Sequence, residues 1–327
     1  MKKLIALLLA LVMMVSLVAC GGEAEAPETP PVEAPEVTDA PTEAPTEAPT
    51  EPKGFEVQTI TSGNFEITVL GAEPVKGMGD APAIRIYYQF KNNAAYTAKA
   101  VNDLTLKASQ NGEEIGSVIP LDGVPEDDNK EYYVRPGAVI RCTSVRELAD
   151  ETSPVVFVIG DYSAEEKLEV EFDLAALPGA PAEALVIAPV ADPQALVGLA
   201  AEGTLDEKYD VAITGVERTT DRNGKDAIVV HYTFTNNSEK AVRFISAVKA
   251  KVFQDGIQLK EAVPADSKDP AYVMKSTDCE VGATVDVDVY YLLTSSSPCE
   301  VEVCDSHITN STDEYFEERI GLIYTVA

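Results

Sequence analysis

The sequence has no tryptophan, only two histidines in 327 residues, and a charge that is strongly of one sign. Its 25 lysines and arginines face 55 aspartates and glutamates, which gives a formal net charge of −30. Such a chain has no net basic surface to displace the counterions of nucleic-acid phosphates, so we expect no nucleic-acid partner. Two histidines leave little room for histidine-based catalysis or a multi-histidine metal site.

Sequence motifs typical of catalytic sites are also missing. The sequence contains no Gly-x-Ser-x-Gly and no glycine-rich phosphate loop. The two histidines, His231 and His307, do not stand at a zinc or catalytic spacing from glutamate or cysteine. We therefore expect a protein that is not an enzyme and that needs no cofactor or metal.

The first twenty residues are typical of a signal sequence. Two lysines precede the apolar run Leu4–Ala19, which would span about 24 Å as a helix and is short for a membrane crossing. The run ends in LVACG, residues 17–21, which resembles the lipobox of bacterial lipoproteins. The resemblance implies that a signal peptide, residues 1–19, is removed and that Cys20 becomes the lipidated, palmitate-bearing N-terminus. Two acyl chains suffice for stable anchoring. The expected partner is therefore the membrane, through Cys20, at the extracytoplasmic face of the bacterial cell.

Residues 20–54 are predicted to be a disordered tether rich in proline, glutamate, threonine and alanine. Residues 40–52 read APTEAPTEAPTEP, a four-residue repeat with almost nothing to bury. Proline favours extended polyproline geometry and the like charges repel one another. We expect a spacer between the membrane and the folded part.

The rest of the chain repeats itself. A shift of 144 residues brings Phe65 onto Tyr209, and one inserted residue then aligns Pro136-Gly137-Ala138 with Val281-Gly282-Ala283. A period of this length indicates two whole domains rather than stacked solenoid units. We predict domain 1 at residues 55–175 and domain 2 at residues 206–327.

Each copy is predicted to consist of strands. Ile84, Ile86, Tyr88 and Phe90 alternate with polar or mixed residues, and the second copy repeats this alternation at 228–234. Asn111-Gly112 and Asp255-Gly256 favour tight hairpin turns. Seven or eight strands in about 120 residues predict an all-β chain with two tandem antiparallel immunoglobulin-like β-sandwiches. The label is architectural, because the Cys…Trp…Cys core of antibody domains is absent.

Residues 176–205 form an apolar connector rich in alanine and proline. Two alternatives stand open for it: it lies against one or both domains, or it is a flexible linker.

The repeated pattern carries a family resemblance. Tyr-x-Phe-x-Asn-Asn closes an alternating strand, a Gln-Asn/Asp-Gly turn follows, and a (Pro/Val)-Gly-Ala turn precedes another strand. This pattern resembles the DUF5067 group of bacterial surface domains, which is related to the DUF4352 group and to the immunoglobulin-like antigen MPT63. The match is closer in the second copy, at Ala227–Gly256 and Val281–Asp305. The resemblance implies a secreted β-sandwich lipoprotein and implies no reaction.

Four cysteines follow Cys20, and their pairing is open. Cys142 and Cys299 share the parity of core residues, whereas Cys304 has the opposite parity. A disulfide between Cys279 and Cys304 or Cys299 is compatible with a location outside the membrane, and free thiols are equally compatible. The acidic loop 122–129 is interpreted as a solvated loop, with a calcium site as the weaker alternative.

Three functions are compatible with these features. The first is a non-enzymatic binding or adhesion module for a protein or cell-envelope component. The second is a structural spacer without a tight ligand. The third is a small-molecule-binding lipoprotein associated with a transporter, which an apolar pocket shared by both copies would favour.

Overall fold

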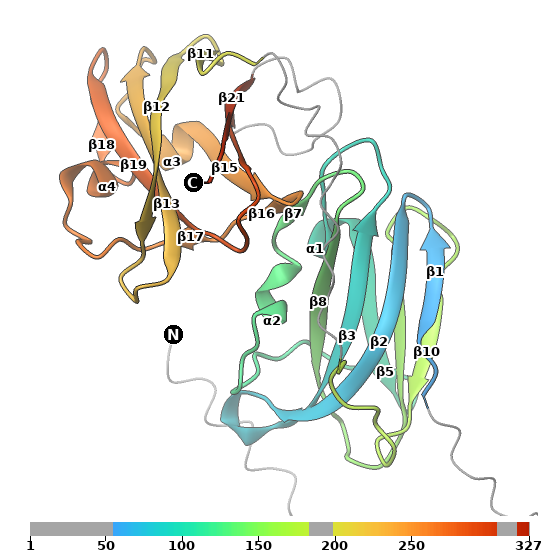
Figure 1. Ribbon diagram of the computed structural model, residues 1–327. Coiled ribbons are helices and arrows are strands. Elements are labelled where there is room, and N and C mark those ends of the chain that lie inside the picture. Colours follow the sequence, from blue (N-terminus) through green and yellow to red (C-terminus); the bar gives the residue numbers. More distant parts are fainter. Residues whose placement is uncertain (1–54, 183–198, 306–318, 327) are drawn as a thin grey trace, which may run out of the picture. The chain divides into compact units, whose positions relative to one another are not determined.

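The strands of the first repeat form two antiparallel sheets. The computed structural model describes residues 55–182, 199–305 and 319–326; the predicted signal peptide, Cys20, the tether 20–54, the connector's middle 183–198 and His307 lie outside them. The first sheet has the order β1 (Gln58–Ser62), β2 (Phe65–Lys76), β3 (Pro82–Asn92) and β8 (Val139–Glu147). The second has the order β10 (Leu168–Phe172), β9 (Val155–Asp161), β5 (Leu104–Gln110) and β6 (Glu113–Glu114), and Figure 1 shows these strands in blue to yellow-green.

The second repeat has the same plan. One sheet contains β11 (Glu202–Leu205), β12 (Tyr209–Thr220), β13 (Asp226–Asn236), β19 (Thr284–Leu292) and β17 (Glu261–Ala262). The facing sheet contains β21 (Arg319–Tyr324), β20 (Cys299–Asp305), β15 (Val248–Gln254) and β16 (Ile257–Gln258), and is extended by β7 (Tyr133–Val134) and β4 (Ala98–Lys99). A two-stranded ribbon joins β14 (Val242–Arg243) to β18 (Asp278–Cys279).

Helices are short throughout the described residues. They are a 3₁₀ turn at Met78–Asp80 and four helices: α1 (Ala100–Asp103), α2 (Glu126–Asn129), α3 (Phe244–Ala247) and α4 (Pro270–Met274). No described helix is long and apolar enough to cross a membrane. The prediction of an all-β chain with two sandwich regions is confirmed.

The internal repeat survives in the strand positions. β2 and β12, β3 and β13, β5 and β15, and β9 and β20 each begin 144 residues apart, and β8 and β19 begin 145 apart, as the single insertion predicts. The hairpin turns also agree, because Asn111, Gly112, Asp255 and Gly256 all have positive φ.

Each repeat has its own core. Phe65, Ile67 and Tyr88 of the first repeat pack with Phe157 and Val170 of the facing sheet. The second repeat buries a similar set, namely Tyr209, Val211, Tyr232, Val301 and Val303. The described residues of both repeats nevertheless belong to one compact unit.

The motif residues of the repeat are structural. The Gln254 amide is 1% exposed and donates to Ser295 O and Ser297 O, while its oxygen accepts the N–H groups of Thr294 and Ser295. Gln110 ties the equivalent turn of the first repeat in the same way. A buried amide with these partners fixes a turn, so these residues serve the fold.

One strand face differs from the alternating pattern. Arg85 on β3 lies on the face opposite Ile84 and Ile86, yet it is only 2% exposed. Its guanidinium donates to Glu73 and Asp127 and to the carbonyl of Asp122, because the loop that carries α2 folds over this face.

The described ends of the connector lie against the sandwiches. Gly179 N donates to Ala72 O, and Leu177 packs on the first core. At the other end Gly321 N donates to Ala200 O, and Ile213 N donates to Ala201 O.

Candidate functional site

Two strands of the first repeat complete a sheet of the second. Val134 of β7 pairs with Ile257 of β16, and Arg135 N donates to Gly256 O at 2.8 Å. Tyr133 N donates to Gln258 Oε1 at 3.2 Å. The sheet β21-β20-β15-β16-β7-β4 is therefore continuous across the two repeats, and we call this region the junction.

A buried arginine sits at the centre of the junction. Arg135 is 5% exposed and its guanidinium lies 2.8 Å from Glu300 Oε2 and 3.0 Å from Glu302 Oε2. It also stacks over the ring of Phe253 at 4.0 Å. Glu302 has two further cationic neighbours, Arg319 at 3.3 Å and Lys251 at 4.0 Å.

The two glutamates have opposite pKa shifts. Burial raises the pKa of Glu300, and the charge of Arg135 offsets only part of this effect. Burial alone would also raise the pKa of Glu302, but the positive charges of Arg135, Lys251 and Arg319 hold it below its usual value. Glu302 is therefore the carboxylate that the cluster keeps ionised.

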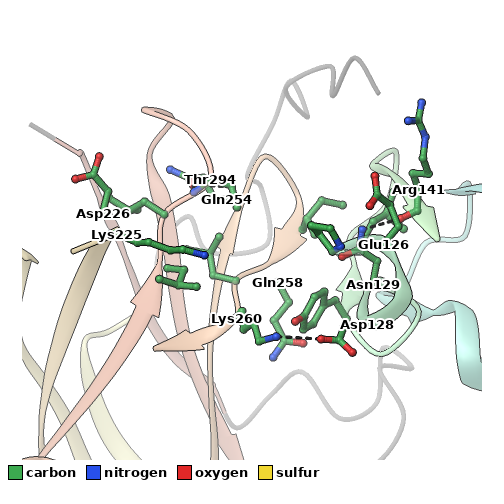
Figure 2. A pocket seen from close by; sticks show the side chains of 17 residues that line it. Glu126, Asp128, Asn129, Arg141, Lys225, Asp226, Gln254, Gln258, Lys260 and Thr294 are labelled. Atoms are coloured by element: carbon green, nitrogen blue, oxygen red, sulfur yellow. Dashed lines mark hydrogen bonds and ion pairs between the residues drawn. The ribbon is translucent and has the colours of Figure 1, made fainter. Parts of the chain in front are cut away.

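Beside this cluster lies a cavity of about 460 Å³, which we call the junction pocket. Residues of both repeats line it: Pro125, Glu126, Asp128, Asn129, Tyr132, Ile140 and Arg141 of the first, and Lys225, Asp226, Gln254, Ile257, Gln258, Leu259, Lys260, Leu292, Leu293 and Thr294 of the second. Figure 2 shows these side chains around the space. The volume falls within the range of about 300–1,000 Å³ typical of small-molecule sites.

The lining of the junction pocket divides into apolar and charged parts. Ile140, Ile257 and Leu259 belong to the apolar part, where Ile140 and Leu259 are 4% and 2% exposed. The charged residues include as many acids as bases. Lys260 and Asp128 form an ion pair, with Lys260 Nζ 3.0 Å from Asp128 Oδ2, as the dashed line in Figure 2 marks. This arrangement suits a ligand with an apolar body and a polar end that carries little net charge.

The acidic loop supplies one wall of the pocket and uses its central carboxylate for structure. Asp127 accepts hydrogen bonds from Arg85, from Thr143 Oγ1 at 2.5 Å and from Val124 N at 2.9 Å. Its oxygens are thus held by protein donors, and no group of three His, Cys, Asp or Glu in the described ranges is placed to hold a metal ion.

Nothing in the pocket forms a recognisable catalytic pair. His231 lies on the central strand β13, where its Nδ1 is 2.7 Å from Asp288 Oδ1 on β19, and neither residue lines the pocket. Ser246 and Lys249 have Ser-x-x-Lys spacing, but Ser246 is exposed at the end of α3. The arrangement can bind and orient a molecule.

The predicted site residues do not converge on the junction pocket. Cys142, Cys279, Cys299 and Cys304 are all free and buried. The sulfur of Cys279 lies 3.5 Å from Ala283 O and that of Cys304 lies 3.9 Å from Lys249 O, so the pairing of these two cysteines is not formed in this structure. The lipidation site Cys20 lies outside the described residues.

Sequence reasoning missed the junction, although the repeat contains a signal for it. Glu300 and Glu302 stand where the first repeat has Val156 and Val158, and Arg135 stands where the second has Glu280. Residues that differ in charge between copies of one fold are candidates for contacts that only one copy makes.

Comparison with known proteins gives a family and partial structural matches. The sequence matches DUF5067, a domain of unknown function, over residues 40–159 and 201–305. No curated protein matches it. Two similar solved structures are each titled as a "putative lipoprotein", one from Staphylococcus aureus and one from Bacillus subtilis. The first is 9% identical with a TM-score of 0.30 and covers 36% of this chain and 84% of its own; the second is 10% identical with a TM-score of 0.29 and covers 38% of each chain.

Proposed function

We propose that this chain, which belongs to the DUF5067 family, is a lipid-anchored bacterial lipoprotein that binds a small amphipathic molecule of the cell envelope without transforming it. The single observation that carries the binding proposal is the junction pocket, which both repeats build. Membrane attachment rests on the sequence around Cys20.

The lipid anchor follows from the N-terminal residues. A positive start, an apolar run too short to span a bilayer and the LVACG sequence at 17–21 support modification of Cys20 at the extracytoplasmic face. A tether of about thirty residues could extend roughly 100 Å at about 3.1 Å per residue. The binding body would then reach well beyond the lipid surface.

Labelling in vivo tests the anchor. Bacteria expressing the full chain are grown with radiolabelled palmitate, and the label is followed on the purified protein. We expect incorporation in the parent chain, none in Cys20→Ser, and full incorporation in Cys279→Ser. Equal label in the parent and Cys20→Ser chains would refute lipidation at this residue.

The binding proposal narrows the hypotheses drawn from the sequence. A protein adhesion surface would need a broad exposed patch, whereas the junction pocket is concave and has apolar walls with a charged part of mixed sign. Leu292 and Leu293 line this pocket, and the first repeat has Glu147 and Leu148 at the equivalent positions. The pocket is thus a property of the pair of repeats and not of each sandwich.

An apolar fluorescent dye tests the pocket. Residues 21–327, which contain both described cores, are titrated with N-phenyl-1-naphthylamine. We expect saturable binding at one site, and at least tenfold weaker binding in Leu292→Trp, because the larger ring would occupy the cavity. The matched control is Glu147→Trp, the equivalent position of the first repeat, which lines no part of the pocket and should leave binding unchanged.

Two outcomes would overturn the binding proposal. One is dye uptake that does not saturate. The other is an equal affinity in the parent, Leu292→Trp and Glu147→Trp proteins. Either result would leave the structural-spacer hypothesis ahead, and neither would affect the palmitate experiment.

A further inference from the structure

A second cavity at the junction has a different chemical character. It has a volume of about 300 Å³, and its polar lining residues are Lys99, Tyr133, Lys249, Lys251, Gln258, Glu261 and Lys275. Four of these residues are lysines and one is acidic. In a chain with 25 basic and 55 acidic residues this is a local reversal of charge, and we call the cavity the lysine pocket.

The register of the continuous sheet brings the lysines together. Lys249 and Lys251 alternate with core residues along β15, so both project from the same face. Lys99 of β4 stands directly opposite Tyr133 of β7. The ammonium groups of Lys99 and Lys251 lie 4.4 and 4.0 Å from the centre of the same Tyr133 ring. Two lysines, one from each repeat, thus flank one aromatic side chain, and Lys249 lies on the same strand face as Lys251.

Two of these lysines have a carboxylate neighbour. Lys275 is paired with Glu261 at 2.9 Å. Lys251 lies 4.0 Å from Glu302, which also lies 3.0 Å from Arg135 and 3.3 Å from Arg319. Glu302 therefore lies close to three cations.

The lysines also disfavour one another's charge. Burial lowers the pKa of Lys99, and the charges of Lys251 and Lys249 lower it further, while Glu131 acts in the opposite direction. Burial lowers the pKa of Lys249, and the charge of Lys251 lowers it further. Cys304 and Asp305 act in the opposite direction and raise it. An anion placed among these ammonium groups would relieve both effects.

We infer that the lysine pocket binds a small phosphate group. Lysine ammonium groups bind phosphate as point charges, and a phosphate group near pH 7 carries more negative charge than a carboxylate, so several lysines around one cavity favour it. Gln258 adds a neutral donor, because its oxygen already accepts the Tyr133 N–H and its NH₂ group is left to donate. The lysine pocket shares Gln258 with the junction pocket but differs from it in charge, because the charged part of the junction pocket is of mixed sign.

Titration with inorganic phosphate tests the inference. Residues 21–327 are titrated by calorimetry at pH 7.5 and constant ionic strength, with sodium acetate as the second anion. We expect saturable phosphate binding and little acetate binding. Lys99→Gln and Lys251→Gln should each weaken phosphate binding about tenfold, since a hydrogen bond to a charged group contributes about that factor. Lys99→Arg should restore most of the loss.

The repeat provides a matched control. Lys107 is the equivalent of Lys251 in the first repeat; its side chain is 63% exposed and is not part of the cavity. Lys107→Gln should leave phosphate binding unchanged. Phosphate binding that equals acetate binding, or that falls as much in Lys107→Gln as in Lys99→Gln, would overturn the inference.

A second arm identifies the source of the phosphate group. Glycerol 3-phosphate binding as tightly as inorganic phosphate would indicate a phosphate carried on an organic molecule, and much weaker binding would indicate the free ion. Far-UV circular dichroism of each variant separates lost binding from lost folding. Dye binding in the junction pocket should be unchanged in Lys99→Gln. The experiments can therefore refute the phosphate proposal and the dye-binding proposal separately.

Discussion

Replacing Arg135 by methionine should uncouple the two repeats. Methionine keeps an unbranched side chain against Phe253 but removes the charge that faces Glu300 and Glu302. All three charged side chains are at most 11% exposed, so the carboxylates would remain buried without their main partner. Removing one partner of a buried pair costs about 3–5 kcal/mol.

The expected loss lies at the lower end of that range, about 3 kcal/mol. Glu302 keeps Arg319 at 3.3 Å and Lys251 at 4.0 Å, which limits the penalty. Glu300 can take up a proton, because burial already raises its pKa. The loss falls on the free energy that holds the sandwiches together, so we expect the two repeats to unfold at separate urea concentrations in Arg135→Met.

The assay is urea denaturation followed by far-UV circular dichroism. Glu280→Met is the matched control, because Glu280 is the exposed equivalent of Arg135 in the second repeat. Adding Glu300→Gln and Glu302→Gln to Arg135→Met should recover part of the loss, since neutral amides need no cation. A change in Arg135→Met within about 0.5 kcal/mol of the Glu280→Met control would refute the reasoning.

The same variant has a defined pH dependence. The pKa of Glu302 in the folded protein lies below its ordinary value of 4.5, so its contribution to stability is present above about pH 4.5 and is lost as the pH falls through the folded value. Arg135→Met should raise that pKa. The difference in stability between parent and variant should therefore be largest near neutral pH and should shrink in acid. A difference that grows on acidification would contradict this assignment.

Two further predictions concern buried groups. Gln254→Ala should destabilise the second sandwich by about 2–3 kcal/mol, because it leaves buried turn groups without their partner. Urea unfolding of Gln254→Ala and of Gln110→Ala should show losses of stability of similar size, each in its own sandwich. The four described cysteines should resist a thiol reagent at pH 8 until the chain unfolds, because burial raises the pKa of Cys299 to about 12 and also raises the pKa values of the other three. Rapid labelling of the native protein would contradict this burial. A mass that is lower by two hydrogens would indicate a disulfide.

The sequence predicts the elements of this fold better than their surroundings. Alternation at Ile84–Phe90 and the shift of 144 residues depend on local chemistry and on the repeat, and both recur in β3 and β13. The same alternation places Arg85 on the face opposite Ile84 and Ile86, and α2 covers this face at Arg85. Period-two patterns show which residues share a face, but they do not show what lies on that face.

The junction was beyond such reasoning for a related reason. β7 has two residues, too few for any periodicity, and its partner β16 is more than a hundred residues away. No local sequence pattern at Tyr133 or Ile257 predicts that the segments containing them pair. Long-range pairing of short strands leaves almost no local trace, so the pockets beside it could not be predicted from spacing or motif.

The charge differences between the copies explain why the first repeat adds strands to a sheet of the second repeat, and not the reverse. The outer face of β20 carries Glu300 and Glu302, whereas the equivalent positions of β9 carry Val156 and Val158. β7, which pairs with β16, is followed by Arg135, and its equivalent in the second repeat, β18, is followed by Glu280. An exchange of roles would place Glu280 against Val156 and Val158. Glu280 would then be a buried charge without a partner, a costly arrangement. The two repeats share a fold, and their differences in charge permit one pairing of β7 with β16; both proposed pockets depend on that single pairing.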